Sequence, residues 1–175
     1  IGGTFHEVDV TDFEGTETVL NAAVDALGGL HIAVTTAGGG IAERTLKKDG
    51  PHSLDSFRKS IDLNLIGTFN VSRLAAWHMS KNDPVDEAAE ERGVIINTAS
   101  IAAFEGQIGQ VAYTASKAAI AGMCLTMARD MGSLGIRALA IAPSLFATGL
   151  TEGIPDEYVS MLTKDAAFPK RLGKP

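Results

Sequence analysis

Three side chains in the second half of the chain have types and spacing that could perform acid–base chemistry. Tyr113 and Lys117 are four residues apart in a segment of helical character, so they share one helix face. A phenol, with a reference pKa of about 10, is a weak acid–base group at neutral pH, but a neighbouring ammonium stabilises the phenolate. Ser100 follows a predicted buried strand, where its hydroxyl could hold an oxygen whose charge changes. Together they indicate proton transfer at a hydroxyl or carbonyl oxygen.

The alternative is that the Tyr113–Lys117 spacing has no catalytic role, because a tyrosine and a lysine occur four residues apart in many helices. The pair alone therefore indicates little. The catalytic interpretation is strengthened by Ser100, which lies thirteen residues before Tyr113 and directly past an apolar strand.

Strands alternate with helices along the chain, and this order must position the three side chains. The expected strands are 5–10, 30–36, 93–98 and 136–142, and the expected helices are 14–27, 54–81, 108–131 and 156–164. Such an order predicts one α/β domain with a parallel sheet and right-handed crossovers. Open parallel sheets bind ligands at the carboxyl ends of their strands, which is where Ser100 lies.

Composition argues against several classes of partner. The net charge of −6 disfavours nucleic acid, since a phosphate backbone rewards Lys and Arg. No apolar run looks long enough to span a bilayer, so no membrane partner is expected. Cys124 is the single cysteine, which excludes a disulfide within the chain and fits a reducing compartment. The histidines show no metal-ligand spacing, and no metal is expected.

The segments Asn97–Ser100 (Asn-Thr-Ala-Ser) and Tyr113–Lys117 (Tyr-Thr-Ala-Ser-Lys) resemble the Ser…Tyr-x-x-x-Lys signature of the short-chain dehydrogenase/reductase family. The resemblance covers nearly the whole chain. It implies a Rossmann-like doubly wound parallel sheet whose N-terminal strands and C-terminal strand are absent from this chain. Residues 1–175 would then form one partial domain of a longer protein. The implied activity is hydride transfer between NAD(P) and a secondary alcohol or ketone.

The same resemblance assigns four catalytic residues. Tyr113 would be the general acid/base, Lys117 would hold the ribose hydroxyls and support the tyrosine, and Ser100 would bind the substrate oxygen. Asn64 would distort its helix slightly and anchor a water linked to Lys117. A hydrogen bond across a helix is the structural alternative for Asn64.

Cofactor contacts also follow from the resemblance. The residues implied are Asp9, Val10, Thr36, Ala37, Gly38, Tyr113, Lys117, Pro143, Phe146 and Thr148. A strand end with a helix cap would equally explain Asp9. The family usually carries Asn-Asn-Ala-Gly where this chain has Thr35–Gly38, and losing the first asparagine predicts a weaker brace to the neighbouring strand. Ser144 also replaces the usual glycine.

The segments Asn97–Gln107, Leu145–Phe146 and Phe168–Gly173 resemble a subgroup, the type 2 3-hydroxyacyl-CoA dehydrogenases, whose members resemble 17β-hydroxysteroid dehydrogenases. This implies NAD and a 3-hydroxyacyl-CoA or hydroxysteroid-like substrate, an activity of fatty acid metabolism. The substrate residues would be Ser100, Gln107 and Tyr113, although a solvated loop glutamine explains Gln107 equally well.

Two other functions fit the visible residues. An NADPH-dependent 3-oxoacyl-[acyl-carrier-protein] reductase uses the same tetrad, and the residue that chooses NAD over NADP would precede residue 1. A non-catalytic binding or scaffold protein could keep the fold. We expect a homotetramer built on helices 54–81 and 108–131, in the cytoplasm or, in a eukaryote, the mitochondrial matrix.

Overall fold

The computed structural model describes residues 3–85, 88, 90–151, 153–164, 166 and 168–175. They fall into two compact units, Ile1–Ala142 and Pro143–Pro175. The first holds α1 (Phe13–Leu27), β1 (Ile32–Thr35), α2 (Leu54–Ile61), the π-helical turn η1 (Asp62–Ile66), α3 (Gly67–Met79), β2 (Gly93–Thr98), the 3-10 turn η2 (Ile101–Ala103), α4 (Val111–Met131), the 3-10 turn η3 (Gly132–Leu134) and β3 (Ile136–Ile141). The second holds the 3-10 turn η4 (Gly149–Thr151) and α5 (Asp156–Thr163).

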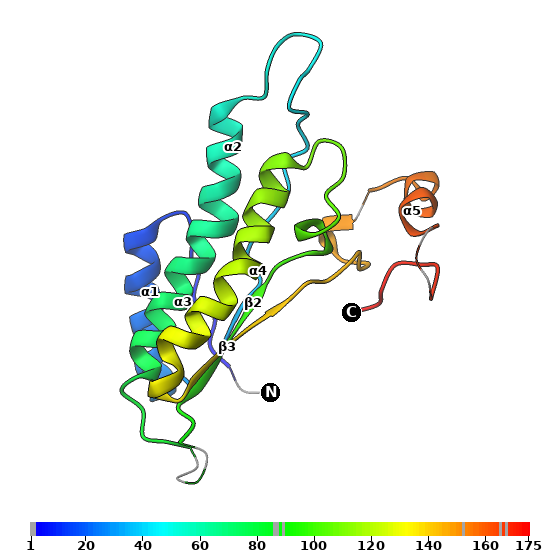
Figure 1. Ribbon diagram of the computed structural model, residues 1–175. Helices are drawn as coiled ribbons and strands as arrows, with labels where there is room; N and C mark the ends of the chain where they lie inside the picture. The colour runs from blue at the N-terminus through cyan, green and yellow to red at the C-terminus, as the bar shows by residue number, and fades with distance from the viewer. Residues whose placement is uncertain (1–2, 86–87, 89, 152, 165, 167) are drawn as a thin grey trace. The chain divides into compact units, whose positions relative to one another are not determined.

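The three described strands form a parallel sheet in the order β1-β2-β3. Ala33, Ile95 and Ala138 are register partners across it, so their side chains point to one face. Helices α3 and α4 pack on that face, and α1 lies beside α3 (Figure 1). The core between sheet and helices contains Ala33, Ala75, Met79, Ile95, Met127, Met131, Ile136 and Ala138. This arrangement confirms the predicted α/β fold with a parallel sheet.

Local signals set the bounds of α1 as predicted. The Asp12 carboxylate accepts a hydrogen bond from the Gly15 N–H (3.0 Å) and caps the helix. Gly28 ends it with φ 74°, a left-handed conformation in which a side chain would be strained.

The strand expected at residues 5–10 is absent from the described part of the chain. A strand needs a neighbour for its backbone groups, and the observed ladders join only β1, β2 and β3. The end of this segment instead forms a turn into α1. Asp9 accepts hydrogen bonds from the Thr11 N–H (2.9 Å) and hydroxyl (2.7 Å), and its carbonyl accepts one from Thr16.

The helix expected over residues 54–81 is interrupted by the π-helical turn Asp62–Ile66, which contains Asn64. Helix α4 begins at Val111, three residues later than predicted. Gly109 explains the delay, because its φ of 85° is incompatible with a helix. The other predicted elements are present with small shifts of their ends.

Thr35 preserves the brace that the sequence suggested was weakened. Its hydroxyl donates to Asn97 Oδ1 on β2 (2.9 Å), and both residues are buried. The Ser72 hydroxyl of α3 lies 2.9 Å from the same oxygen. A threonine therefore replaces asparagine by reaching the neighbouring strand through its hydroxyl.

One expectation from composition needs correction. The segment Val111–Leu134 has 24 residues and contains an 18-residue window with a mean hydropathy of 1.2, so it is long and apolar enough to cross a membrane by those two measures. Its contacts explain the composition otherwise, because α4 packs along β3 and β2 and contributes Ile120, Met127 and Met131 to the buried core.

Candidate active site

Ser100 is placed by the end of β2. It lies two residues past Thr98 with extended backbone, and its hydroxyl accepts the Ala102 N–H (3.1 Å), which caps η2. Turn η2 packs against α4. The segment that carries Ser100 is therefore held against the helix that carries Tyr113 and Lys117.

Lys117 is buried at 3% exposure, and its ammonium donates to the Thr98 carbonyl (2.8 Å). The Nζ atom lies 5.6 Å from the centre of the Tyr113 ring. Burial lowers the pKa of Lys117, because a low-dielectric environment disfavours the charged form. The lysine thus connects the end of β2 to the tyrosine, and the helical spacing places the two side chains together as predicted.

Asn64 lies in the π-helical turn and is fully buried. Its amide donates to the Ser60 carbonyl (2.9 Å) and to the Gly39 carbonyl (2.9 Å), and its oxygen accepts the Gly39 N–H (3.1 Å). The side chain therefore ties the segment after β1 to the distorted helix.

Gly38 is the point where the two polar side chains converge. A Cβ at this position would lie 2.7 Å from Asn64 Oδ1 and 3.4 Å from Lys117 Nζ. The first distance is shorter than real Cβ contacts allow, so the backbone can pass here only without a side chain. The predicted contact of Gly38 with the cofactor stays a prediction.

A second contact joins the distorted helix to α4. Ser116, adjacent to Lys117 and fully buried, shares its hydroxyl between the Ala112 carbonyl (2.8 Å) and the Ser60 carbonyl (3.3 Å). Ser60 O thereby accepts from both Asn64 and Ser116. This contact was not foreseen, because nothing in sequence spacing indicates which buried serine faces which helix.

Some of the residues predicted to contact the cofactor lie in the first unit, next to the elements that carry this site. Thr36 and Ala37 are exposed just past the end of β1. Asp9 is exposed, and the hydrogen bonds from Thr11 lower its pKa. Val10 contacts the start of α3, where a Cβ on Gly67 would lie 3.0 Å from Val10 Cγ2.

Pro143, Phe146 and Thr148 belong to the second unit. Within it, Phe146 forms an isolated parallel bridge with Gly173, and the Thr148 N–H donates to the Thr151 hydroxyl (3.0 Å). Their predicted cofactor contacts stay predictions.

The donors present fit a ribose-bearing cofactor. A lysine ammonium has three N–H groups, and the described residues give Lys117 one hydrogen-bond acceptor, Thr98 O. The remaining donors could bind hydroxyl oxygens beside Tyr113. Gly40 lies beside this ring, where a Cβ would be 3.9 Å away, an ordinary van der Waals distance.

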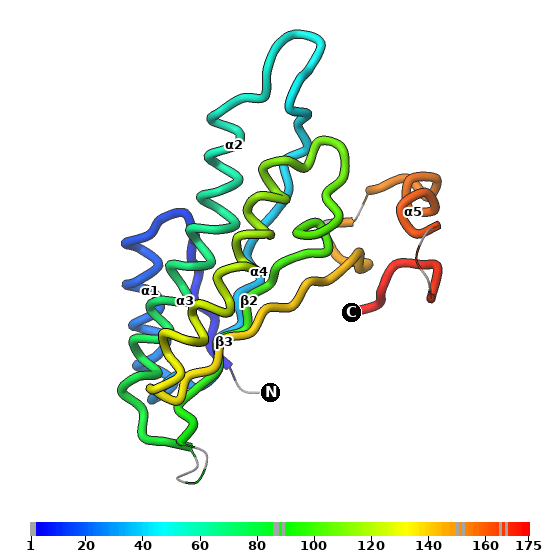
Figure 2. The backbone as a smooth tube through the Cα atoms, viewed as in Figure 1, coloured from blue at the N-terminus to red at the C-terminus, as the bar shows by residue number. Residues whose placement is uncertain are grey.

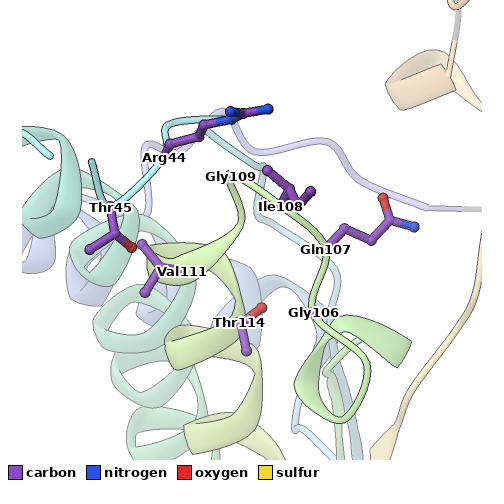
Figure 3. Close-up of a pocket in the computed structure, with 8 residues that line it drawn as sticks. All are labelled: Arg44, Thr45, Gly106, Gln107, Ile108, Gly109, Val111 and Thr114. Carbon is purple, nitrogen blue, oxygen red and sulfur yellow. The ribbon is translucent and has the colours of Figure 1, made fainter. Parts of the chain in front are cut away.

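An open pocket of about 510 Å³ lies next to the start of α4. Figure 3 shows Arg44 and Thr45 on one segment and the 106–109 segment opposite them. The full lining is Arg44, Thr45, Gly106, Gln107, Ile108, Gly109, Val111 and Thr114. Gln107, a predicted substrate residue, is among them. Arg44 and Thr45 were missed, because the sequence reads that region only as a loop. Among the described residues, no group of His, Cys, Asp and Glu could hold a metal ion.

A parallel α/β sheet with Ser100, Tyr113, Lys117 and Asn64 around the carboxyl ends of its strands defines a Rossmann-like protein with a Ser–Tyr–Lys site. Residues 3–158 match the family model described as short chain dehydrogenase, and the chain belongs to this family.

Named relatives agree with the subgroup resemblance. The chain is 47% identical over 173 residues to 3-hydroxyacyl-CoA dehydrogenase type-2 of Homo sapiens, covering 98% of this chain and 66% of that protein. The Drosophila melanogaster protein of the same name is 46% identical over 173 residues, with 98% and 67% covered. The crystal structure of 3-hydroxyacyl-CoA dehydrogenase type-2 from Mycobacterium avium superposes with a TM-score of 0.88 at 42% identity, covering 97% of this chain and 65% of that one. The chain thus spans about two thirds of the length of these relatives.

Proposed function

We propose that the protein is an NAD(P)-dependent oxidoreductase that interconverts a secondary alcohol and a ketone. The observation that carries this is the buried Lys117 ammonium 5.6 Å from the Tyr113 ring, bonded to the strand end that leads to Ser100. A cation at this place favours the phenolate, which is the form that can remove a proton.

In the oxidative direction, Tyr113 would take the proton of the substrate hydroxyl while Ser100 donates a hydrogen bond to the same oxygen. Acceptance of hydride from the carbinol carbon is the chemistry that bound NAD or NADP supplies. Lys117 would hold ribose hydroxyls with its remaining N–H groups. Asn64 keeps the Gly38–Gly39 backbone in place beneath them.

For the substrate we propose a 3-hydroxyacyl-CoA, with NAD as the favoured cofactor. The support is the 47% identity to a relative of that name and the open pocket that presents Gln107 and Ile108 near the start of α4. A hydroxysteroid-like substrate would present the same hydroxyl to Tyr113. No nucleic acid partner and no membrane partner are proposed.

We propose a homotetramer as the working assembly. Apolar side chains are exposed on the helices expected to form it, among them Phe69 and Trp77 on α3 and Leu125 on α4. Sedimentation at micromolar concentration tests this, and a strict monomer would contradict it. Cytoplasm, or the mitochondrial matrix in a eukaryote, is the proposed compartment.

The decisive experiment measures NADH formation from 3-hydroxybutyryl-CoA and NAD, and the reverse reaction with acetoacetyl-CoA. Saturable turnover with NAD supports the proposal. Turnover restricted to NADPH and 3-oxoacyl carrier-protein thioesters would assign the reductase function instead. Cofactor binding without turnover of any hydroxy or oxo substrate would indicate a non-catalytic member.

A further inference from the structure

The loop 41–53 forms one wall of the pocket and folds back on itself. The Lys47 N–H donates to the Gly50 carbonyl (2.9 Å), and the His52 N–H donates to the Thr45 carbonyl (2.9 Å). Leu46 and Pro51 form an antiparallel bridge between the two arms. Figure 2 traces this loop beyond the N-terminal end of α2. Its arm with Arg44 and Thr45 faces the pocket.

One carboxylate joins the parts of this loop. Glu43 Oε1 accepts the Lys47 ammonium (2.8 Å) and the Ser53 N–H (3.0 Å), and the Glu43 side chain is only 12% exposed. Ser53 is the N-cap of α2. The carboxylate therefore holds both arms of the loop to the first turn of the helix that leads to Asn64.

The backbone of Glu43 reaches the opposite wall. Its N–H donates to the Gly109 carbonyl (2.8 Å), and its carbonyl lies 3.2 Å from His52 Nδ1. The second imidazole nitrogen is buried without a hydrogen-bond partner among the described residues, and it lies 3.8 Å from Glu43 Oε2. The Glu43 backbone thus bonds the opposite wall, whereas its carboxylate bonds Lys47 and Ser53 of its own loop. Arg44 and Thr45 follow it directly.

We propose that Glu43 is a positioning residue that sets the separation of the two pocket walls and thereby the acyl-chain length that the enzyme accepts. This rests on the proposed function in taking the pocket as the acyl site. The hydrogen bonds from Lys47 and Ser53 hold the pKa of Glu43 at about 2, so the carboxylate stays ionised at any working pH. A glutamine of the same shape keeps one acceptor but loses the attraction for the ammonium.

The test compares Glu43→Gln and Glu43→Ala with Asp55→Asn as the matched control. Asp55 also pairs with a cation near the start of α2, Arg58 at 3.5 Å, but it is exposed and away from the pocket. We expect the ratio of kcat/KM for long-chain to short-chain 3-hydroxyacyl-CoA to shift about fivefold in both Glu43 variants, with kcat within about twofold. Asp55→Asn should leave the ratio unchanged.

Amide exchange at residues 44–45 and 107–109 provides a readout that does not depend on turnover. Faster exchange on both walls in Glu43→Ala, but not in Asp55→Asn, supports the positioning role of Glu43. An unchanged substrate ratio, or equal exchange in all variants, overturns it. If the wild type turns over no 3-hydroxyacyl-CoA, the proposed function fails. The exchange comparison then still tests whether Glu43 positions the two walls.

Discussion

Two parts of the candidate site are held in different ways. We call Asn64 and Lys117, with the backbone they bond, the floor, and the two pocket walls, loop 41–53 and segment 106–109, the rim. On the floor, Asn64 and Lys117 bond to backbone groups of the segments that follow β1 and end β2, and both are almost fully buried. At the rim, loop 41–53 is closed by backbone bonds between its own arms, and it is joined to α2 by the Glu43 carboxylate and to the opposite wall by one backbone bond to Gly109. Several buried hydrogen bonds therefore fix the floor, whereas fewer contacts join the rim to its surroundings. Reaction chemistry should resist mutation outside the floor, whereas substrate preference should respond to single changes at the rim.

The largest effect should come from Tyr113→Phe on the floor. Removing the only group proposed to carry the proton should lower kcat by about 10²–10⁴-fold, with cofactor affinity nearly unchanged. Steady-state turnover and NADH fluorescence titration measure the two quantities. Tyr158→Phe, which changes an exposed tyrosine of α5, is the control and should retain its rate. A wild-type rate in Tyr113→Phe would remove the tyrosine from the mechanism.

Next in size is Asn64→Ala, which tests how the floor is held. It leaves Gly39 N–H and carbonyl without their buried partner, so we expect a loss of about 3 kcal/mol in the free energy of unfolding. Turnover should fall as well, because the backbone beneath Lys117 loosens. Asn70→Ala removes another buried amide, which bonds Phe13 O on α1 (3.1 Å), and should reduce stability without a matching loss of kcat. Urea unfolding and kcat are measured for both variants. If Asn64→Ala and Asn70→Ala have equal kcat, the role of Asn64 is purely structural.

A smaller effect is expected at the rim from Gln107→Ala. If the side chain hydrogen-bonds the substrate, its loss should raise KM about fivefold with kcat unchanged, since one such bond contributes about 1 kcal/mol. Glu105→Ala lies in the same exposed segment but outside the pocket lining, and it should change neither constant. An unaltered KM would mean that Gln107 is a solvated loop residue and that the rim selects by shape alone.

The smallest effect is a pH dependence from Lys117. Burial lowers its pKa from 10.5, so the unfolded chain holds the proton to higher pH than the folded one. Stability contributed by this residue therefore rises as pH increases through the lowered pKa toward 10.5. Relative to Lys117→Met, the wild type should gain stability over that alkaline range, as measured by urea unfolding at several pH values. A constant difference would show that the folded environment does not penalise the ammonium.

Much of the fold could be predicted because its signals are local. The apolar run Gly93–Thr98 gives β2, and Asp12 and Gly28 give the ends of α1. The misses have non-local causes. Residues 5–10 have strand-like sequence, but a strand forms only where a partner lies beside it. Apolar spacing predicts an unbroken helix through Asn64, whereas the family resemblance implied a distortion there, and the π-helical turn agrees with the resemblance.

The same division applies to the site. Tyr113 and Lys117 were placed by helical spacing, and Ser100 by its position after a strand. The bonds of Thr35 to Asn97 and of Glu43 to Lys47 and Ser53 depend on side-chain directions in folded loops and strands, which spacing does not specify. Family resemblance named the residues proposed to act, and the structure added contacts that hold them in place.

The double use of the Ser60 carbonyl, by Asn64 and by Ser116, has a consequence for sequence length. Inserting or deleting one residue between Ser60 and Asn64, or between Ala112 and Ser116, would turn the side chains beyond it away from their partners, by about 100° around the axis in the α-helical stretch. Homologous or engineered chains with a working floor should therefore show no length polymorphism in these two stretches. In loop 41–53 the described bonds are the Glu43 contacts and the backbone bonds between its arms, so lengthening the hairpin at its tip is a practical way to alter what the pocket admits.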